Sequence, residues 1–190
     1  MVDHVIDTNV LVVASAAHPD SPFKDSDVPD SQMAIVLAWL MAFWKDSRRN
    51  LVLDSQGKIL KEYRGKLRKG RDIGLMVVAE KLLFARFHEI DYDANDVGCL
   101  PPELEMVVHD RNDRKLVAVA LTDLAQGLQS SIINASDGDW YDWEKALKQA
   151  DVVVEQLIED WSRPQWEAKQ KKKSKPKTGL RPARTRKKAT

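Results

Sequence analysis

Short apolar segments alternate along this chain with longer segments whose apolar residues recur every three or four positions. The short segments are typical of buried strands, and the longer pattern is typical of helices that cover a sheet. Such an alternation predicts an α/β fold in which helices cover both faces of a parallel sheet. Strands are expected over 4–7, 51–53, 87–90, 131–134 and 152–154, and helices over 9–17, 31–46, 57–68, 72–84, 113–126 and 140–149.

The charge of the chain is divided unevenly between its body and its C-terminal end. The segment from Ala168 to Thr190 holds eleven Lys and Arg residues and no Asp or Glu, which leaves 19 basic and 29 acidic residues in the rest. Beyond Trp166 the composition is too polar to bury a core, so disorder is expected there. We predict one α/β domain over residues 1–160 and a basic tail over residues 161–190.

The basic tail has two interpretations that the sequence leaves open. It is an electrostatic handle that binds RNA or DNA through phosphates, or it is a disordered end that keeps the chain soluble. As a handle it would contact nucleic acid through Lys171, Lys172, Lys173, Arg184 and Arg186.

Cysteine content and hydropathy limit the cellular compartments in which we expect the protein. The single cysteine, Cys99, cannot form an internal disulfide and is expected to be a small buried side chain. Asp3 and Asp7 interrupt the only N-terminal apolar run, so no secretory signal is expected. The longest apolar stretch, Met33 to Trp44, has 12 residues, whereas spanning a bilayer takes about 20. We therefore expect a cytoplasmic protein with no membrane partner.

Acidic residues collect where the expected strands end. Asp7 closes the first strand, and Asp137 and Asp139 follow the strand at 131–134. Asp113 begins the long helix after the third strand, and Glu62 lies about one turn into the helix after the second. Ligands of open parallel sheets bind outside the carboxyl ends of the strands. We therefore expect these acids to meet at one edge of the sheet.

Several carboxylates in one cleft repel each other and raise each other's pKa values, and a hard divalent cation removes that cost. Ligation by oxygen alone, with no His or Cys cluster nearby, favours Mg²⁺ or Mn²⁺ over zinc. Such an ion activates water and orients a phosphodiester. Phosphodiester hydrolysis is the expected chemistry.

Each acid taken alone also has a structural explanation. Asp7 and Asp113 are suited to cap the helices that follow them, and Glu62 could be a solvated helix residue. The two acids after the fourth strand are typical of a turn. Asp110 lies close enough in sequence to replace Asp113. The combination of acids at successive strand ends is what favours a site.

Other side chains near these acids are also open to two interpretations. Trp140, Tyr141 and Trp143 could stack on bases, but aromatic residues on a helix that covers a sheet are more often core, which we favour. His109 could transfer protons beside the acids, or be a loop residue without a role. The apolar helix that Ser31 is expected to cap could be a dimer face, a partner groove or a buried helix.

Four segments resemble the motifs of the PIN-domain nucleases, in the right order over roughly the first 150 residues. Segment 5–11, VIDTNVL, is similar to the opening motif, in which the Asp is a metal ligand and the Asn supports it. Segments 57–63, 112–120 and 132–140 resemble the second, third and fourth motifs. The resemblance assigns the metal-binding acids to Asp7, Glu62, Asp113 and Asp137, with Asp139 as an accessory ligand.

The resemblance implies a three-layer α/β/α fold with a central, mostly parallel sheet and a Mg²⁺- or Mn²⁺-dependent endoribonuclease that acts on single-stranded RNA. The acids would hold one or two ions, and Thr8, Asn9 and Ser136 would orient acids or substrate through hydrogen bonds. Hydrolysis would leave a 5′-phosphate and a 3′-hydroxyl. Many small bacterial members are toxins silenced by an antitoxin, so an antitoxin is an expected partner beside the RNA substrate. A homodimer through the apolar helix 31–46 is the other expected partner.

Two departures from the family pattern leave other functions open. Ala135 and Ser136 stand where a Thr-Asn pair is common, and the basic extension is longer than a minimal toxin carries. The alternatives are a non-catalytic nucleic-acid-binding or adaptor protein on the same scaffold, and a structure-selective DNA nuclease. An aspartyl phosphatase is disfavoured, because Asn9 stands where such an enzyme needs a second Asp.

Overall fold

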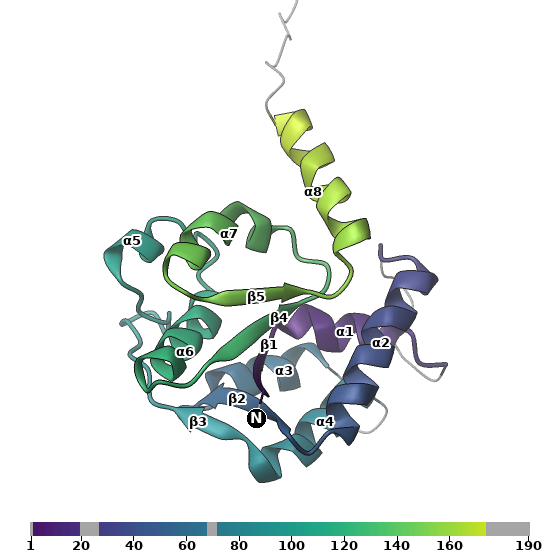
Figure 1. The fold of residues 1–190 in the computed structure, drawn as a ribbon, viewed down its shortest axis with the longest axis horizontal. Helices are drawn as coiled ribbons and strands as arrows, with labels where there is room; N and C mark the ends of the chain where they lie inside the picture. The colour runs from purple at the N-terminus through teal and green to yellow at the C-terminus, as the bar shows by residue number, and fades with distance from the viewer. Residues whose placement is uncertain (1, 20–26, 68–71, 174–190) are drawn as a thin grey trace, which may run out of the picture.

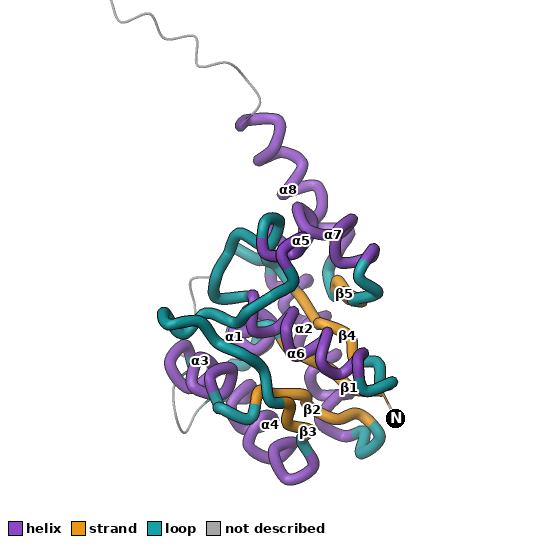
Figure 2. Tube along the Cα trace, turned by 90° about the vertical axis from the view of Figure 1, so that its left-hand side faces the viewer, coloured by secondary structure: helices purple, strands orange, loops and turns teal. Residues whose placement is uncertain are grey.

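The computed structural model describes residues 2–19, 27–67 and 72–173, and its centre is a five-stranded sheet (Figure 1). The strands lie in the order β3-β2-β1-β4-β5, and every neighbouring pair is parallel. Figure 2 shows the same order, with the strands following each other from β5 near the top to β3 near the bottom. The strands are β1 (Val2–Ile6), β2 (Arg49–Asp54), β3 (Arg86–His88), β4 (Ser130–Asn134) and β5 (Val153–Gln156).

Helices cover both faces of this sheet, so the predicted three-layer α/β/α fold is confirmed. Helices α1, α2, α3 and α4 pack together on one face, and α6 and α7 cover the other (Figure 1). The helices of these layers are α1 (Thr8–Ala16), α2 (Asp30–Lys45), α3 (Lys58–Lys66), α4 (Ile73–Lys81), α6 (Arg114–Ala125) and α7 (Asp139–Gln149). The short α5 (Pro102–Glu105), the 3₁₀ turn η1 (Leu82–Phe84) and α8 (Glu159–Lys173) complete the described chain.

The apolar runs that predicted the strands form the centre of the core. Strands covered on both faces have no solvent-facing side, so their side chains are apolar in succession rather than in alternation. Val5 and Ile6 in β1 and Ile132 and Ile133 in β4 are fully buried. These β-branched residues also favour the extended backbone that a strand needs.

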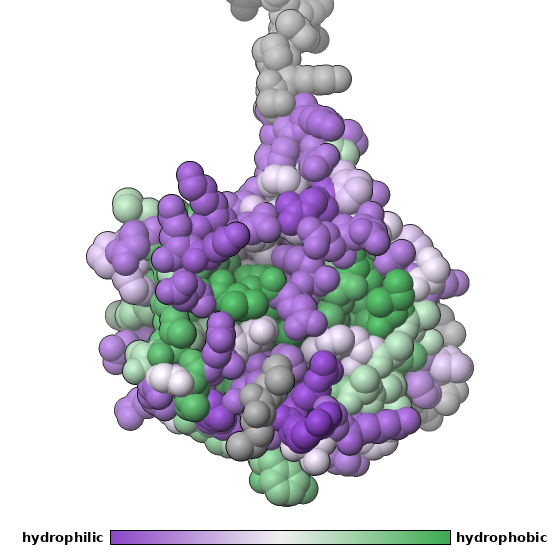
Figure 3. Space-filling model, in the orientation of Figure 1, coloured by the Kyte–Doolittle hydropathy of each residue, from purple (hydrophilic) through white to green (hydrophobic). Residues whose placement is uncertain are grey.

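Helix α2 is buried on one side only. It begins at Asp30 after Pro29, so the predicted Ser31 cap is wrong, and no side chain caps its first turn. Pro29 has an extended backbone that is suited to the residue before a helix. Val36 and Phe43 are fully buried, whereas Ile35 is 48% exposed. Figure 3 shows apolar residues gathered over this helix, so it packs under the sheet and also leaves an apolar surface.

Helix α8 corrects the expectation of disorder beyond Trp166 for residues 167–173. The helix continues to Lys173 and leaves the body at the top of Figure 1. Its second half is fixed to α7, because Trp166 Nε1 donates to Asp142 Oδ1 at 2.8 Å and Gln170 Nε2 donates to the same oxygen at 2.8 Å. The polar composition hid these contacts. Residues 174–190 lie outside the described part.

Two simpler expectations had different outcomes. Cys99 is exposed rather than buried, because it lies in the loop between β3 and α5 and not in an element of the core. Within the described residues, no helix combines the length and the hydrophobicity that crossing a membrane requires.

Candidate metal centre

The carboxyl ends of β1 and β4 open into one cleft of about 470 Å³. These two strands are neighbours, but the chain leaves β1 toward one face of the sheet and leaves β4 toward the other. A reversal of this kind is where open α/β sheets bind ligands. The cleft is lined by Asp7, Thr8, Asn9, Val12, Glu62, Lys66, Asp110, Asn112, Asp113 and Asp137. The four acids that the resemblance assigns to metal therefore share one cleft.

Asp7 stands at the centre of this group, directly after β1. Its side chain caps α1, because Oδ1 accepts from the backbone N–H of Asn9 at 3.0 Å. Its other oxygen, Oδ2, accepts from Trp140 Nε1 at 2.7 Å. Burial raises the pKa of Asp7 to about 7, and the negative charges of Asp137 and Glu62 add to that rise. The capping role and the site role are therefore combined in one residue.

Asp113 is the acid of the cleft whose carboxylate is least compensated by neighbouring groups. It stands at the start of α6, but its side chain makes no capping hydrogen bond. It is 9% exposed, and its Oδ2 is buried with no hydrogen-bond partner among the described residues. Burial raises its pKa to about 9, with further contributions from Asp7, Asp110 and Asp137. An unpaired buried carboxylate oxygen is costly, and a cation would remove that cost.

Asp137 and Asp110 complete the acidic lining. Asp137 Oδ1 accepts from the backbone N–H of Asp139 at 2.9 Å, which is the turn that the sequence also allowed. Burial raises the pKa of Asp137, and the charges of Asp139 and Asp110 raise it further. Asp110 is only partly buried, and its Oδ1 accepts from Asn112 N at 2.8 Å. Of the two acids that competed for one role, Asp113 has the stronger claim to a cation.

Glu62 differs from the other acids of the cleft because one of its oxygens forms an ion pair. Thr8 Oγ1 donates to Oε1 at 2.5 Å. Lys115 Nζ lies 2.6 Å from Oε2. The sequence analysis missed Lys115, although its position two residues after Asp113 was a signal that could have identified it.

Asn9 joins the two sides of the cleft. Its Oδ1 accepts from the backbone N–H groups of Ala135 and Ser136 at 2.9 and 3.2 Å, and its Nδ2 donates to Asn134 Oδ1 at 2.8 Å. Asn134 Nδ2 in turn donates to the carbonyl oxygen of Asp137 at 2.8 Å. These bonds fix the loop that carries Asp137, so Asn9 supports the site as predicted, and Ser136 takes part through its backbone.

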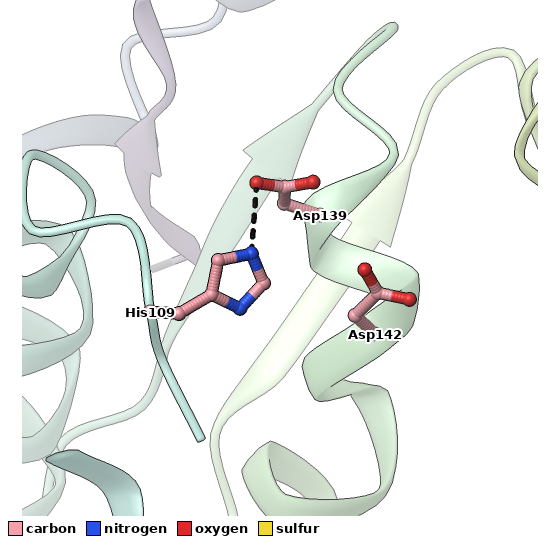
Figure 4. Close-up of side chains that lie close together, drawn as sticks. All are labelled: His109, Asp139 and Asp142. Carbon is pink, nitrogen blue, oxygen red and sulfur yellow. Dashed lines mark ion pairs between the residues drawn. The ribbon is translucent and has the colours of Figure 1, made fainter. Parts of the chain in front are cut away.

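Asp139 belongs to a second acidic group beside the cleft. Its Oδ2 lies 3.3 Å from His109 Nε2, and Asp142 projects from the next turn of α7 on the same side (Figure 4). Among the described residues, His109, Asp139 and Asp142 are the one group of three or more His, Cys, Asp or Glu residues whose ligand atoms all lie within 4.8 Å of one another. Asp139 supports the cleft only through its backbone N–H.

The His109 group is nevertheless poorly suited to a metal. Trp143 Nε1 donates to His109 Nδ1 at 3.0 Å, and an indole nitrogen can only donate. In a neutral imidazole the proton is then on Nε2, the nitrogen that lies 3.3 Å from Asp139 Oδ2. A metal at Nε2 would have to displace this proton. Asp142 Oδ1 is also occupied, because it accepts from Trp166 and Gln170.

The cleft acids are spaced more widely than the His109 group. Mg²⁺ usually keeps several waters and takes only one or two carboxylates directly. Wide spacing is therefore compatible with this ion, and the oxygen-only lining fits Mg²⁺ or Mn²⁺.

The aromatic residues next to the site are part of the core. Trp140 and Trp143 are fully buried and meet edge to face with their ring centroids 5.2 Å apart, and Tyr141 is 4% exposed. They are not available for stacking on bases, so the preferred core interpretation is confirmed.

The lysines of the predicted basic tail that the structure describes lie on α8. Lys171, Lys172 and Lys173 are exposed in the last turn of α8. The positive charge of Lys169, one turn earlier, is close enough to lower the pKa of Asp137. Lys169 therefore lies near enough to act on the cleft, whereas α8 itself extends away from the body (Figure 1). The predicted contacts Arg184 and Arg186 lie outside the described residues.

A search of protein-family models, curated proteins and solved structures finds no match to this chain. The class that fold and site define is an α/β/α protein with an acidic cleft at the reversal point of its sheet. Any closer assignment rests on the four motifs and on the chemistry of the cleft.

Proposed function

We propose that this chain is a divalent-metal-dependent endoribonuclease that resembles the PIN-domain nucleases and hydrolyses phosphodiester bonds of single-stranded RNA. The observation that carries the proposal is the buried, unpartnered Oδ2 of Asp113 in a cleft that also contains Asp7 and Asp137. Such a cluster is stable only if it holds protons or a cation.

The side chains divide the work of the site. Asp7, Asp113 and Asp137 would hold the ion, and Glu62 faces the same cleft beside Thr8. When bound, the ion supplies the charge that polarises the phosphate and lowers the pKa of water. The hydrogen bonds of Asn9 keep the two sides of the cleft in register. As the resemblance implies, the products carry a 5′-phosphate and a 3′-hydroxyl.

RNA would reach the cleft along the basic side of the molecule. Lys169 puts positive charge near an acidic cleft that would otherwise repel phosphates, and Lys171, Lys172 and Lys173 continue this charge along α8. Changing the last three lysines to alanine should lower the salt dependence of RNA binding by a slope of about 2, since each phosphate contact to a single strand contributes about 0.7. An unchanged slope in a salt titration would remove this role.

The test of the activity is cleavage of a mixed panel of single-stranded and duplex RNA and DNA with Mg²⁺, with Mn²⁺ and with EDTA. We expect metal-dependent cleavage of single-stranded RNA. Cleavage confined to branched or flapped DNA would establish the structure-selective DNA nuclease instead. Binding without cleavage under all metal conditions would establish the adaptor.

The remaining expectations from the resemblance are part of this proposal. They are a cytoplasmic location, an antitoxin partner and a homodimer. Coexpression of the neighbouring open reading frame, followed by growth and pull-down assays, tests the antitoxin.

A further inference from the structure

Lys115 places a cation against Glu62, one of the acids that line the cleft. It lies in the first turn of α6, two residues after Asp113, and is 8% exposed. Its Nζ lies 2.6 Å from Glu62 Oε2 and also donates to the carbonyl oxygen of Asn112. A lysine is buried to this degree only when it is paired. Its ammonium group is therefore a fixed component of the site.

Close packing of the backbone fixes the position of Lys115 at the start of α6. A Cβ atom at Gly98 would lie 2.8 Å from Lys115 Cα and 2.9 Å from its backbone nitrogen, so only glycine lets this loop pack against the start of α6. The neighbouring Arg114 points elsewhere, because it bonds to the carbonyl oxygen of Val108 and to Glu105. Of these two adjacent cations, only Lys115 reaches Glu62.

The acids of the cleft therefore form two sets. Glu62 has a hydroxyl on one oxygen and an ammonium group on the other. Asp113 has a buried oxygen with no described partner, and among the described residues the one ion pair made by the four acids Asp7, Glu62, Asp113 and Asp137 is that of Glu62. Glu62 is already neutralised by the chain itself, whereas the three aspartates are not. A bound divalent cation is therefore stabilised most by the negative charges of the three aspartates.

We infer that Lys115 takes the place of a second metal ion. The cleft then holds one divalent cation on the side of Asp7, Asp113 and Asp137, and Lys115 is a positioning residue that fixes Glu62. Two-ion sites hold their cations about 4 Å apart and clamp both sides of the phosphate. This inference rests on the proposed metal-dependent function.

The test counts the Mn²⁺ ions bound by the full chain, using calorimetry and the EPR signal of free Mn²⁺. Wild type and Lys115→Arg should bind one ion. Lys115→Met should bind two, because Glu62 becomes available as a ligand. The matched control is Lys66→Met, which removes a cation from the exposed rim of the same cleft and should still bind one ion.

A second readout is the dependence of RNA cleavage on Mn²⁺ concentration. Lys115→Met should cleave about 10-fold more slowly at low Mn²⁺ and recover at high Mn²⁺, with the Hill coefficient for the ion rising from about 1 to about 2. A purely structural role would not change this coefficient.

The outcomes separate the inference from the function on which it rests. Two ions bound to wild type, or one ion and an unchanged Mn²⁺ dependence in a folded Lys115→Met variant, would overturn the role of Lys115 and leave the nuclease proposal intact. No Mn²⁺ bound to wild type would overturn both. If Lys115→Met does not fold, Lys115→Gln replaces it, and the wild-type ion count decides independently.

Discussion

Two acidic groups lie side by side in this protein, and they differ in how deeply their side chains are buried. The ligand atoms of the His109 group (His109, Asp139 and Asp142) lie closer to one another than those of the cleft acids do. Two of its three side chains already accept hydrogen bonds, however: His109 from Trp143, and Asp142 from Trp166 and Gln170. The aspartates of the cleft are more widely spaced, but they are buried and their pKa values are raised. We therefore propose the cleft, and not the closely spaced His109 group, as the cation site.

The largest effect should come from removing a carboxylate from the cleft. Changing Asp7 to Asn keeps an acceptor for the N–H of Asn9 but removes the charge, so we expect RNA cleavage to fall by on the order of 10³-fold. The control is Asp142→Asn in the His109 group, which should cleave like wild type. Equal losses of RNA cleavage in the two variants would show that the cleft and the His109 group do not differ in function.

The second effect is stabilisation by metal. An ion that binds only the folded state at 100 times its Kd should raise the free energy of unfolding by about 2.7 kcal/mol. Asp113→Asn should lose this increment, because the buried carboxylate that needs the cation is gone. Asp142→Asn should retain it. Thermal unfolding with and without Mn²⁺ measures both, and a shift retained in Asp113→Asn would argue for a different site.

The third effect is the pH dependence of the metal-free protein. A carboxyl group whose pKa is raised in the folded state stabilises the fold below its unfolded pKa, and this stability is lost as the pH rises through the folded pKa. Because the pKa of Asp113 is about 9 and that of Asp7 about 7, Asp113 dominates between pH 7 and 9. We expect a loss of about 2 kcal/mol in this window.

Urea unfolding at several pH values in EDTA measures this loss. Asp113→Asn should flatten the curve between pH 7 and 9, since an amide does not titrate there. Asp139→Asn should keep the slope. A flat curve in wild type would mean that the aspartates do not hold protons in the way their burial requires.

The smallest effect should come from the His109 group itself. Asp142→Asn weakens the acceptor for Trp166 and Gln170, so α8 should be held less firmly to α7, at a cost of about 1 kcal/mol. Hydrogen exchange should become faster in α8 and stay unchanged in the strands. Weaker Mn²⁺ binding in this variant would show that the second group does hold the ion.

The sequence predicted most of the fold because its signals are local. The β-branched pairs Val5-Ile6 and Ile132-Ile133 mark fully buried strands, and alternation with helices requires the parallel order. The direction of parallel strands then brings Asp7 and Asp137 to one edge of the sheet. Helix α8 was missed because its polar composition and Pro164 resemble a disordered tail, while its contacts to α7 depend on tertiary structure.

The partners of the site acids could not be predicted in the same way. The sequence places Arg114 and Lys115 at equivalent positions, and only the rotation of α6 sends one to Glu105 and the other to Glu62. The bond from Trp140 to Asp7 joins residues 133 positions apart. The hydrogen bond from Trp143 that fixes the tautomer of His109 is also a tertiary contact. The sequence therefore could not show that the His109 group is poorly suited to a metal.

The most direct measurement is the anomalous difference density of a crystal of the full chain soaked in Mn²⁺. The two-group comparison predicts a peak in the cleft within coordinating distance of Asp113, with Asp7 and Asp137 around it. A peak between His109, Asp139 and Asp142, with none in the cleft, would contradict the assignment of the metal to the unsatisfied aspartates.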